Sequence, residues 1–224
     1  MAIKAIVMDF YGTLAKDNSM VVKDICYRIS QSSHRMVSPS EVGQAWWRYM
    51  TERTRESYAD KFRPIRVLER NAIHRLVDEY DSYEDPELMA QELFESLRKP
   101  VAYADSRLFI GRLPLPVCVV ANADRDDLEM AVAFTRLDID LLACSETARA
   151  YKPREEVFEL ALSYLGVRPD QALHVGDSMS YDVEPAQRLG MKTAWINRHS
   201  RINNSTIKAD VECPSLTDLR MLIK

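Results

Sequence analysis

A short apolar strand that ends in an acid opens the chain and constrains how the rest can fold. Residues 3–9 are Ile-Lys-Ala-Ile-Val-Met-Asp, and Gly12 follows Asp9 closely. A buried strand delivers a carboxylate at its carboxyl end, and a glycine then lets the backbone turn away with little side-chain bulk. Open α/β sheets bind their ligands at this edge. The sequence therefore predicts Asp9 at the rim of a sheet.

The strand pattern stops after Leu14, and helical periodicity replaces it as far as residue 98. We predict helices over residues 21–32, 40–58, 62–80 and 86–97, with Ser40 as the N-cap of the second. From residue 99 onward, strands are predicted at 117–121, 141–144, 172–175 and 193–196, and helices at 126–137, 154–165, 185–189 and 215–223. This alternation predicts a parallel sheet built from βαβ units.

The predicted fold is an α/β protein with a doubly wound, Rossmann-like core and an inserted helical cap. Residues 1–14 and 99–224 form the core domain in this prediction, and residues 15–98 form the cap domain. The large side chains of Trp46, Trp47, Met50 and Phe62 are expected mainly to pack inside the cap. The paired tryptophans are also a candidate face for a homodimer, so the oligomeric state is left open.

Composition narrows the range of partners and locations. The 224 residues are 46% hydrophobic and carry a net charge of −4, which suits a packed core and gives no basic surface for nucleic acid. No apolar run approaches the roughly 18 residues of a membrane span or forms a signal-peptide core. The four cysteines are scattered without zinc-binding spacing. We expect a cytoplasmic protein with reduced thiols, structural histidines and a small-molecule anionic substrate.

Polar side chains follow several of the predicted strands. Asp9, Asn122, Lys152 and Asp177 each lie directly after a strand or in the loop beyond it. Because the carboxyl ends of parallel strands meet at one edge of a sheet, we expect these four side chains to lie together. Two acids and a lysine at one rim predict a ligand-binding site.

The order of these residues resembles the four sequence motifs of the haloacid dehalogenase superfamily. The motifs are Asp9-x-Tyr11-Gly12-Thr13-Leu14, Ala121-Asn122, Tyr151-Lys152-Pro153 and Gly176-Asp177-Ser178-x-x-x-Asp182. They span nearly the whole chain and occur in the superfamily's order, which makes the resemblance far more specific than any one motif. The helical segment after Leu14 also matches the position of the cap in the superfamily's first subclass.

This resemblance implies a hydrolase in which Asp9 is a covalent nucleophile. Lys152 would neutralise the clustered carboxylates and the anionic substrate. Asn122 and Thr13 would bind the group that is transferred.

The same resemblance implies a magnesium site. Asp9, the backbone carbonyl of Tyr11 and Asp177 would hold the ion, and Asp182 would support the site or bind the ion directly. Magnesium suits an all-oxygen site, and it would screen the repulsion between a carboxylate nucleophile and a phosphate.

Two positions depart from the pattern of the superfamily's phosphatases. Tyr11 stands where those enzymes have a second aspartate that protonates the leaving group, and Ala121 stands where they usually have serine or threonine. A missing general acid typically lowers the rate by a factor of about 10² to 10⁴. Tyr11 therefore stays a candidate catalytic residue whose role is open.

The sequence favours one function and leaves two alternatives. Magnesium-dependent hydrolysis of a small phosphorylated metabolite is the first, because Asp177 and Asp182 have the magnesium-binding spacing. Metal-independent 2-haloacid dehalogenation is the second: those enzymes carry tyrosine at the position of Tyr11, halide leaves without a proton, and Arg48 could meet the substrate carboxylate. The third is a regulatory or binding protein that keeps the fold with little turnover.

Overall fold

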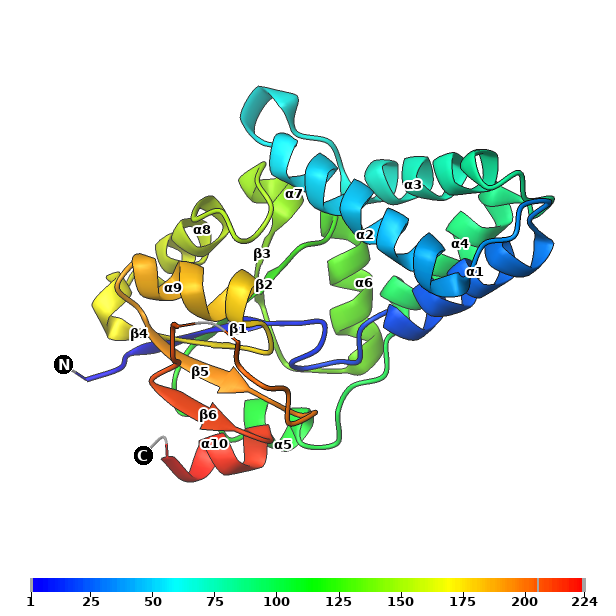
Figure 1. Cartoon of the computed structure of the whole chain (residues 1–224). Helices are drawn as coiled ribbons and strands as arrows, with labels where there is room; N and C mark the ends of the chain where they lie inside the picture. Colours follow the sequence, from blue (N-terminus) through cyan, green and yellow to red (C-terminus); the bar gives the residue numbers. More distant parts are fainter. Residues whose placement is uncertain (1, 205, 223–224) are drawn as a thin grey trace.

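The chain folds around a six-stranded parallel sheet with helices on both faces (Figure 1). This computed structural model describes residues 2–204 and 206–222. The strand order is β3-β2-β1-β4-β5-β6. The strands are β1 (Ala5–Asp9), β2 (Val117–Ala121), β3 (Leu141–Cys144), β4 (Ala172–Gly176), β5 (Lys192–Ile196) and β6 (Val211–Cys213). The order reverses direction beside β1, which is where doubly wound sheets bind ligands. The predicted α/β fold is confirmed.

Alternation along β1 sends its side chains to two separate cores. Ile6 and Met8 join a cluster that includes residues of α5 (Ser106–Ile110), α6 (Arg125–Thr135) and α10 (Leu216–Leu222). Val7 joins the cluster on the other face, which includes residues of α8 (Glu156–Leu165) and α9 (Glu184–Arg188). All five residues of the strand are buried. Helices on both faces therefore fix the strand that carries Asp9.

The inserted segment forms a layer of helices above the sheet (Figure 1). Its main helices are α1 (Ser19–Ser32), α2 (Pro39–Glu56), α3 (Ile65–Glu79) and α4 (Pro86–Arg98), with a short 3-10 helix η1 (Ala59–Lys61) before α3. Their apolar faces pack into a cluster of their own that includes Ile25, Trp46, Ile73 and Leu93. The helical layer therefore has an apolar core of its own. The domain boundaries at residues 14 and 99 stay a prediction.

The start of α2 differs from the prediction. The helix begins at Pro39, and Ser38 is its N-cap in place of Ser40. The Ser38 side chain accepts a hydrogen bond from the Glu41 N–H at 3.3 Å, and the Glu41 carboxylate accepts one from the Ser38 N–H at 2.8 Å. Proline suits the first helical position because its φ is already helical and it needs no hydrogen-bond partner there. The reciprocal cap between Ser38 and Glu41 therefore starts the helix one residue earlier than Ser40.

Several short elements were not predicted. These are β6, α5, α7 (Ser145–Ala148), the 3-10 helix η2 (Pro169–Gln171) and the π-helix η3 (Met179–Val183). Segments of three to five residues are too short to show a hydrophobic period. The closing helix is confirmed as α10, with Ser215 accepting from the Asp218 N–H at 3.3 Å, whereas its last predicted residue, Ile223, lies outside the described residues.

Other packing predictions have mixed outcomes. The four cysteines are free and buried, as expected. Trp46 and Phe62 are buried, but Trp47 is 62% exposed, and its ring meets that of Tyr181 with centroids 6.4 Å apart. No helix within residues 2–204 and 206–222 is long and apolar enough to cross a membrane.

Candidate active site

Asp9 ends β1 at the carboxyl edge of the sheet, where only 5% of its surface is exposed. Its Oδ1 atom accepts a hydrogen bond from the Lys152 ammonium at 2.6 Å. Its Oδ2 atom is buried and has no hydrogen-bond partner among the described residues. A buried acceptor without a donor is unfavourable. This oxygen is therefore available to a ligand.

Lys152 joins two carboxylates in the buried centre of the site. Its ammonium donates to Asp9 at 2.6 Å and to Asp182 at 2.7 Å. The side chain of Asn122 holds the lysine backbone: its oxygen accepts from the Lys152 N–H at 2.8 Å, and its NH₂ donates to the Lys152 carbonyl at 3.2 Å. Asn122 thus positions Lys152, a role that the sequence did not predict. The predicted contact of Asn122 with the transferred group stays a prediction.

Two further acids follow β4. Asp182 lies in η3 and is buried, and its Oδ2 atom accepts from the Ser178 N–H at 3.0 Å. Asp177 is partly exposed, and its Oδ2 atom accepts from the Arg201 guanidinium at 2.8 Å. The same guanidinium donates to the Asp177 backbone carbonyl. Ligand atoms of Asp9, Asp177 and Asp182 all lie within 4.8 Å of one another.

Two glycines let the backbone come close to these acids. A Cβ atom at Gly12, whose φ is +98°, would lie 2.7–2.9 Å from the carboxylate of Asp177. A Cβ atom at Gly176 would overlap the carboxyl group of Asp182. A larger residue at either position would displace an acid, and at Gly12 it would also strain the backbone. Both glycines are therefore required by the position of the acids.

Burial and charge shift the pKa values of the cluster in different directions. Burial raises the pKa of Asp9 to about 7, although Lys152 opposes this. Burial also favours a raised pKa for Asp182, but Lys152 outweighs it and holds that pKa well below the ordinary range. Burial tends to lower the pKa of Lys152, and Asp182 and Asp9 more than offset this, so its pKa is raised. The ammonium therefore stays charged at neutral pH.

The donor set fits a magnesium ion. Magnesium prefers oxygen ligands and usually keeps several waters. Asp9 offers a buried oxygen without a donor, and Asp177 offers a second carboxylate that is partly open to solvent. Asp182 already uses one oxygen for Lys152 and the other for Ser178, so a supporting role suits it best. A cation at this point would also lower the pKa of Asp9, which burial raises.

Tyr11 and Thr13 lie in the turn that follows Asp9. The Tyr11 hydroxyl donates to the carbonyl of Leu97 at 2.8 Å, near the end of α4. Burial raises the pKa of this phenol, so it stays protonated. The Thr13 hydroxyl is buried and has no partner within the described part of the chain, so it is free to bind a ligand. The roles predicted for both residues remain predictions.

Arg48, the predicted cation of the cap, lies apart from this cluster. It is exposed on α2, and its charge acts on Tyr80 at the end of α3. Within residues 2–204 and 206–222, no hydrogen bond or ion pair joins Arg48 to the carboxylates. Its contact with a substrate stays a prediction.

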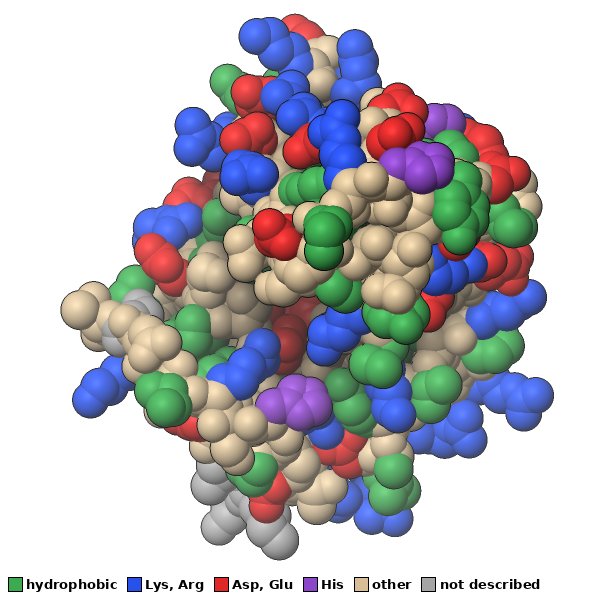
Figure 2. Space-filling model, turned by 45° about the vertical axis from the view of Figure 1, so that its right-hand side comes forward, with side chains coloured by type: hydrophobic (Ala, Val, Ile, Leu, Met, Phe, Trp, Pro, Cys, Tyr) green, Lys and Arg blue, Asp and Glu red, His purple; other side chains and the backbone are tan. Residues whose placement is uncertain are grey.

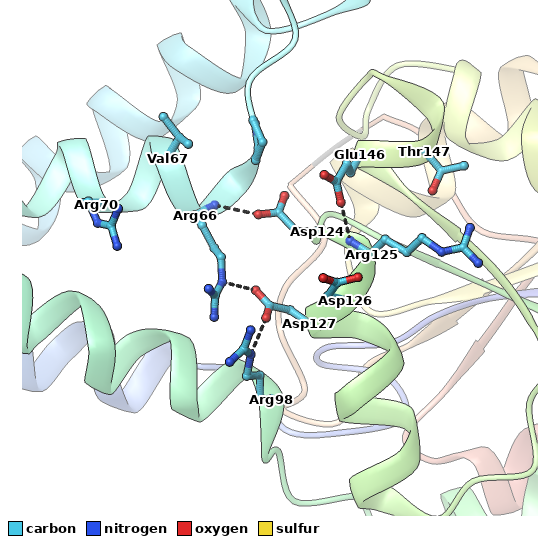
Figure 3. A pocket seen from close by; sticks show the side chains of 11 residues that line it. Arg66, Val67, Arg70, Arg98, Asp124, Arg125, Asp126, Asp127, Glu146 and Thr147 are labelled. Atoms are coloured by element: carbon cyan, nitrogen blue, oxygen red, sulfur yellow. Dashed lines mark hydrogen bonds and ion pairs between the residues drawn. The ribbon is translucent and has the colours of Figure 1, made fainter.

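Asp124 and Asp127 attach the helical layer to the core (Figure 3). Asp127 on α6 is 2% exposed and accepts from Arg66 of α3 at 2.5 Å and from Arg98 of α4 at 2.6 Å. Asp124 accepts from the backbone N–H groups of Ile65 and Arg66, at 2.8 and 3.2 Å. The start of α3 and the end of α4 are thereby held against α6.

The sequence did not identify Glu69 and Arg201. Glu69 is a buried acid on α3, whose Oε2 atom has no hydrogen-bond partner among the described residues. A signal was present, because Glu69 occupies the helical face that also carries Ile65, Ala72 and Ile73. Arg201 gave no such signal, since it lies in an exposed loop beyond β5.

A hollow separates the helical layer from the sheet, and acidic side chains are visible at its floor (Figure 2). Basic side chains lie beside these acids in the same view. A substrate that enters here would meet charges of both signs.

Comparisons with known proteins identify the family and the fold. A family model described as haloacid dehalogenase-like hydrolase matches residues 3–190. The chain is 24% identical over 204 residues to (S)-2-haloacid dehalogenase 4A of Burkholderia cepacia, covering 88% of this chain and 84% of that protein. It is 22% identical over 232 residues to pyrophosphatase PpaX of Bacillus anthracis, covering 100% and 97%. The crystal structure of the L-2-haloacid dehalogenase RSc1362 is similar, with a TM-score of 0.81, 20% identity and coverage of 100% and 99%.

Proposed function

The chain belongs to the haloacid dehalogenase-like hydrolase family, and we propose that within this family it is a magnesium-dependent phosphatase of a small phosphorylated metabolite. One observation carries this proposal. The Oδ2 atom of Asp9 is buried without a donor, and it belongs to a cluster of three acids whose ligand atoms lie within 4.8 Å of one another. Asp177 adds a negative charge that a cation would balance. Similarity to a pyrophosphatase also supports phosphoryl chemistry.

Asp9 is the proposed nucleophile. One of its carboxylate oxygens attacks the phosphorus atom, the bond from phosphorus to the leaving oxygen breaks, and that oxygen takes a proton from the solvent. Water then attacks the acyl-phosphate, which releases inorganic phosphate and a proton and restores the carboxylate. The hydrogen bond from Lys152 to Oδ1 fixes the orientation of the carboxylate, and Oδ2 is the oxygen that would bind the magnesium ion.

The other residues would hold the charged groups in place. Asp9, Asp177 and the backbone carbonyl of Tyr11 would bind the magnesium ion, and Asp182 would support them. The ion would supply positive charge that offsets the repulsion between the nucleophile and the phosphate. Lys152 adds a second positive charge, and Asn122 holds that lysine by its backbone. The unpartnered hydroxyl of Thr13 is available to the phosphoryl oxygens.

Phosphate release from p-nitrophenyl phosphate tests this function. Its leaving group needs no proton at neutral pH, so the missing aspartate at position 11 would not block it. We expect release with magnesium, loss of release with excess chelator, and no release by Asp9→Asn. Absence of phosphate release, together with absence of magnesium binding in calorimetry, would contradict the proposal.

A second candidate is metal-independent 2-haloacid dehalogenation, which the ion pair between Arg201 and Asp177 favours. A guanidinium 2.8 Å from Asp177 already neutralises the acid that otherwise calls for a metal ion. Similarity to a 2-haloacid dehalogenase agrees with this. Halide release from 2-chloropropionate in excess chelator would support this candidate over the phosphatase.

Further parts of the description are proposals as well. We propose a cytoplasmic location, a core domain of residues 1–14 and 99–224, and a cap domain of residues 15–98; the separate apolar cluster of the helical layer supports the division. A homodimer through the exposed Trp47 remains a candidate assembly. If neither phosphate nor halide is released, a regulatory or binding role becomes the better account.

A further inference from the structure

We propose that a small cavity between α3 and the core binds the leaving group of the substrate, and that Glu69 recognises a hydrogen-bond donor on that group, an ammonium or a hydroxyl. This inference rests on the proposed phosphatase function. It names the chemistry of the substrate, which neither the family nor the motifs specify.

The cavity lies beside residues of the candidate active site. Its volume is about 140 Å³, and its walls include Tyr11, two positions beyond the nucleophile, and Asn122, which holds Lys152. Leu97 and Ile65 close the side formed by the helical layer. A cavity of roughly 150 Å³ is large enough for a molecule the size of benzene. A leaving group of a few non-hydrogen atoms therefore fits here.

Glu69 is the buried acid of this cavity that lacks a partner. Its side chain is 93% buried, because only 7% of its surface is exposed, and it lines the cavity wall. Its Oε2 atom accepts no hydrogen bond within residues 2–204 and 206–222. Burying a carboxyl group without a donor is unfavourable by itself. A ligand that carries a donor would remove this deficit.

The neighbouring acids cannot take that donor in place of Glu69. Asp127 is occupied by Arg66 and Arg98, and Asp124 is occupied by two backbone N–H groups at the start of α3. Glu69 is thus the acid in the described cavity wall that remains free for recognition.

The charges of the cavity also select the type of ligand. The charged residues in its wall, Glu69, Asp124 and Asp127, are all acidic, and no lysine or arginine is among the described residues that line it. Burial and then the nearby acids raise the pKa of Glu69, and the Arg66 guanidinium opposes this in part. An anionic leaving group is therefore disfavoured, and an ammonium is preferred to a hydroxyl.

Three phosphate monoesters of matched size distinguish these possibilities: 2-aminoethyl phosphate, 2-hydroxyethyl phosphate and propyl phosphate. Binding is measured by calorimetry with magnesium in the Asp9→Asn protein, so that turnover does not interfere. We expect the amine to bind at least about tenfold more tightly than the propyl ester, with the hydroxyl ester between them. In the active protein, the same order is expected for kcat/KM.

Variants at Glu69 separate charge from hydrogen bonding. Glu69→Gln keeps an acceptor but cannot become a carboxylate when an ammonium binds, so the preference for the amine should fall while the preference for the hydroxyl remains. Glu69→Leu should abolish both preferences and improve binding of the propyl ester. Glu79→Gln, at a partly exposed acid at the end of the same helix that pairs with Arg75, is the matched control and should change neither.

The outcomes are distinct. Equal binding of the three esters by the protein with Glu69 intact would overturn the proposal, as would a uniform loss of affinity in Glu69→Leu, because that result indicates a purely structural role. Failure to hydrolyse p-nitrophenyl phosphate would instead reject the phosphatase function, and the order of binding would still decide the role of Glu69.

Discussion

Buried acids lie on both sides of the candidate site, and their surroundings differ. At the sheet edge, Asp9 and Asp182 share the ammonium of Lys152 at 2.6 and 2.7 Å. In the helical layer, Glu69 has no donor within the described part of the chain. At the sheet edge, the chain supplies a positive charge, on Lys152, that balances the acids. Among the described residues, Glu69 has no such partner. Removing one member of a compensated group exposes the other charges, while removing an uncompensated group relieves the fold.

Asp127 shows that this contrast is not simply one between core and helical layer. It lies at the same interface as Glu69, and it has two arginine partners. The interface can therefore compensate a buried carboxylate, and it leaves Glu69 without this compensation.

Asp9→Asn should abolish hydrolysis with little change to the fold. Loss of a covalent nucleophile lowers kcat by about 10⁴-fold or more. The amide oxygen of the variant can still accept the hydrogen bond from Lys152, so the compensated cluster keeps its geometry. Steady-state kinetics and thermal unfolding measure the two effects. Activity within tenfold of the unmodified protein would rule out Asp9 as the nucleophile.

Lys152→Met should give the largest loss of stability at the sheet edge. It leaves Asp9 and Asp182 buried without their shared cation, and breaking a buried ion pair typically costs about 3–5 kcal/mol. Denaturant unfolding measures this free energy. Lys99→Met removes an exposed pair with Glu95 and serves as the control, for which little change is expected. An equal loss of unfolding free energy in Lys152→Met and Lys99→Met would show that the buried ion pairs contribute no more than the exposed one.

Asp127→Ala should loosen the helical layer by about 2 kcal/mol, because hydrogen bonds to charged groups are worth about 1.5–3 kcal/mol and both arginines are partly exposed. Hydrogen exchange should rise at the start of α3 and the end of α4. The exposed Asp126→Ala, on the same turn of α6, is the control. Unchanged exchange in Asp127→Ala would show that another contact anchors this layer.

Glu69→Gln should stabilise the protein increasingly as the pH rises. Burial raises the pKa of Glu69 from its ordinary 4.5 to about 8, so between these values the folded protein holds a proton that the unfolded chain releases. Stability of the unmodified protein from this group therefore falls as the pH rises through this window. Thermal unfolding of both proteins from pH 4 to pH 9 measures the difference. A constant difference across that range would show that Glu69 has a partner.

Arg201→Ala should have the smallest effect, a rise of about two- to fivefold in magnesium affinity. The guanidinium competes with a metal ion for Asp177, and its own exposure keeps this ion pair weak. Calorimetric titration of the free protein measures the change. Lower magnesium affinity would contradict the competition, and lost dehalogenation in chelator would instead favour Arg201 as the replacement for a metal.

The fold class and the central acids could be predicted from the order of residues alone. The carboxyl ends of parallel strands meet at one edge whatever the loops between them do, so the positions of Asp9 and Asp177 after apolar strands were enough to bring them together. The same reasoning placed Lys152 at this edge, and the structure puts its ammonium in contact with Asp9. Short elements such as β6 were not predicted, because three residues are too few to show a hydrophobic period.

Which polar groups have partners could not be predicted, because it depends on how the folded elements pack. The contacts of Asn122 with the Lys152 backbone, of Tyr11 with Leu97 and of Arg201 with Asp177 join residues 24 to 86 positions apart. Such contacts depend on how loops and helices pack, which hydrophobic periodicity does not encode. The apolar face of α3 could have drawn attention to Glu69, but its lack of a donor follows from the packing of α3 against the core.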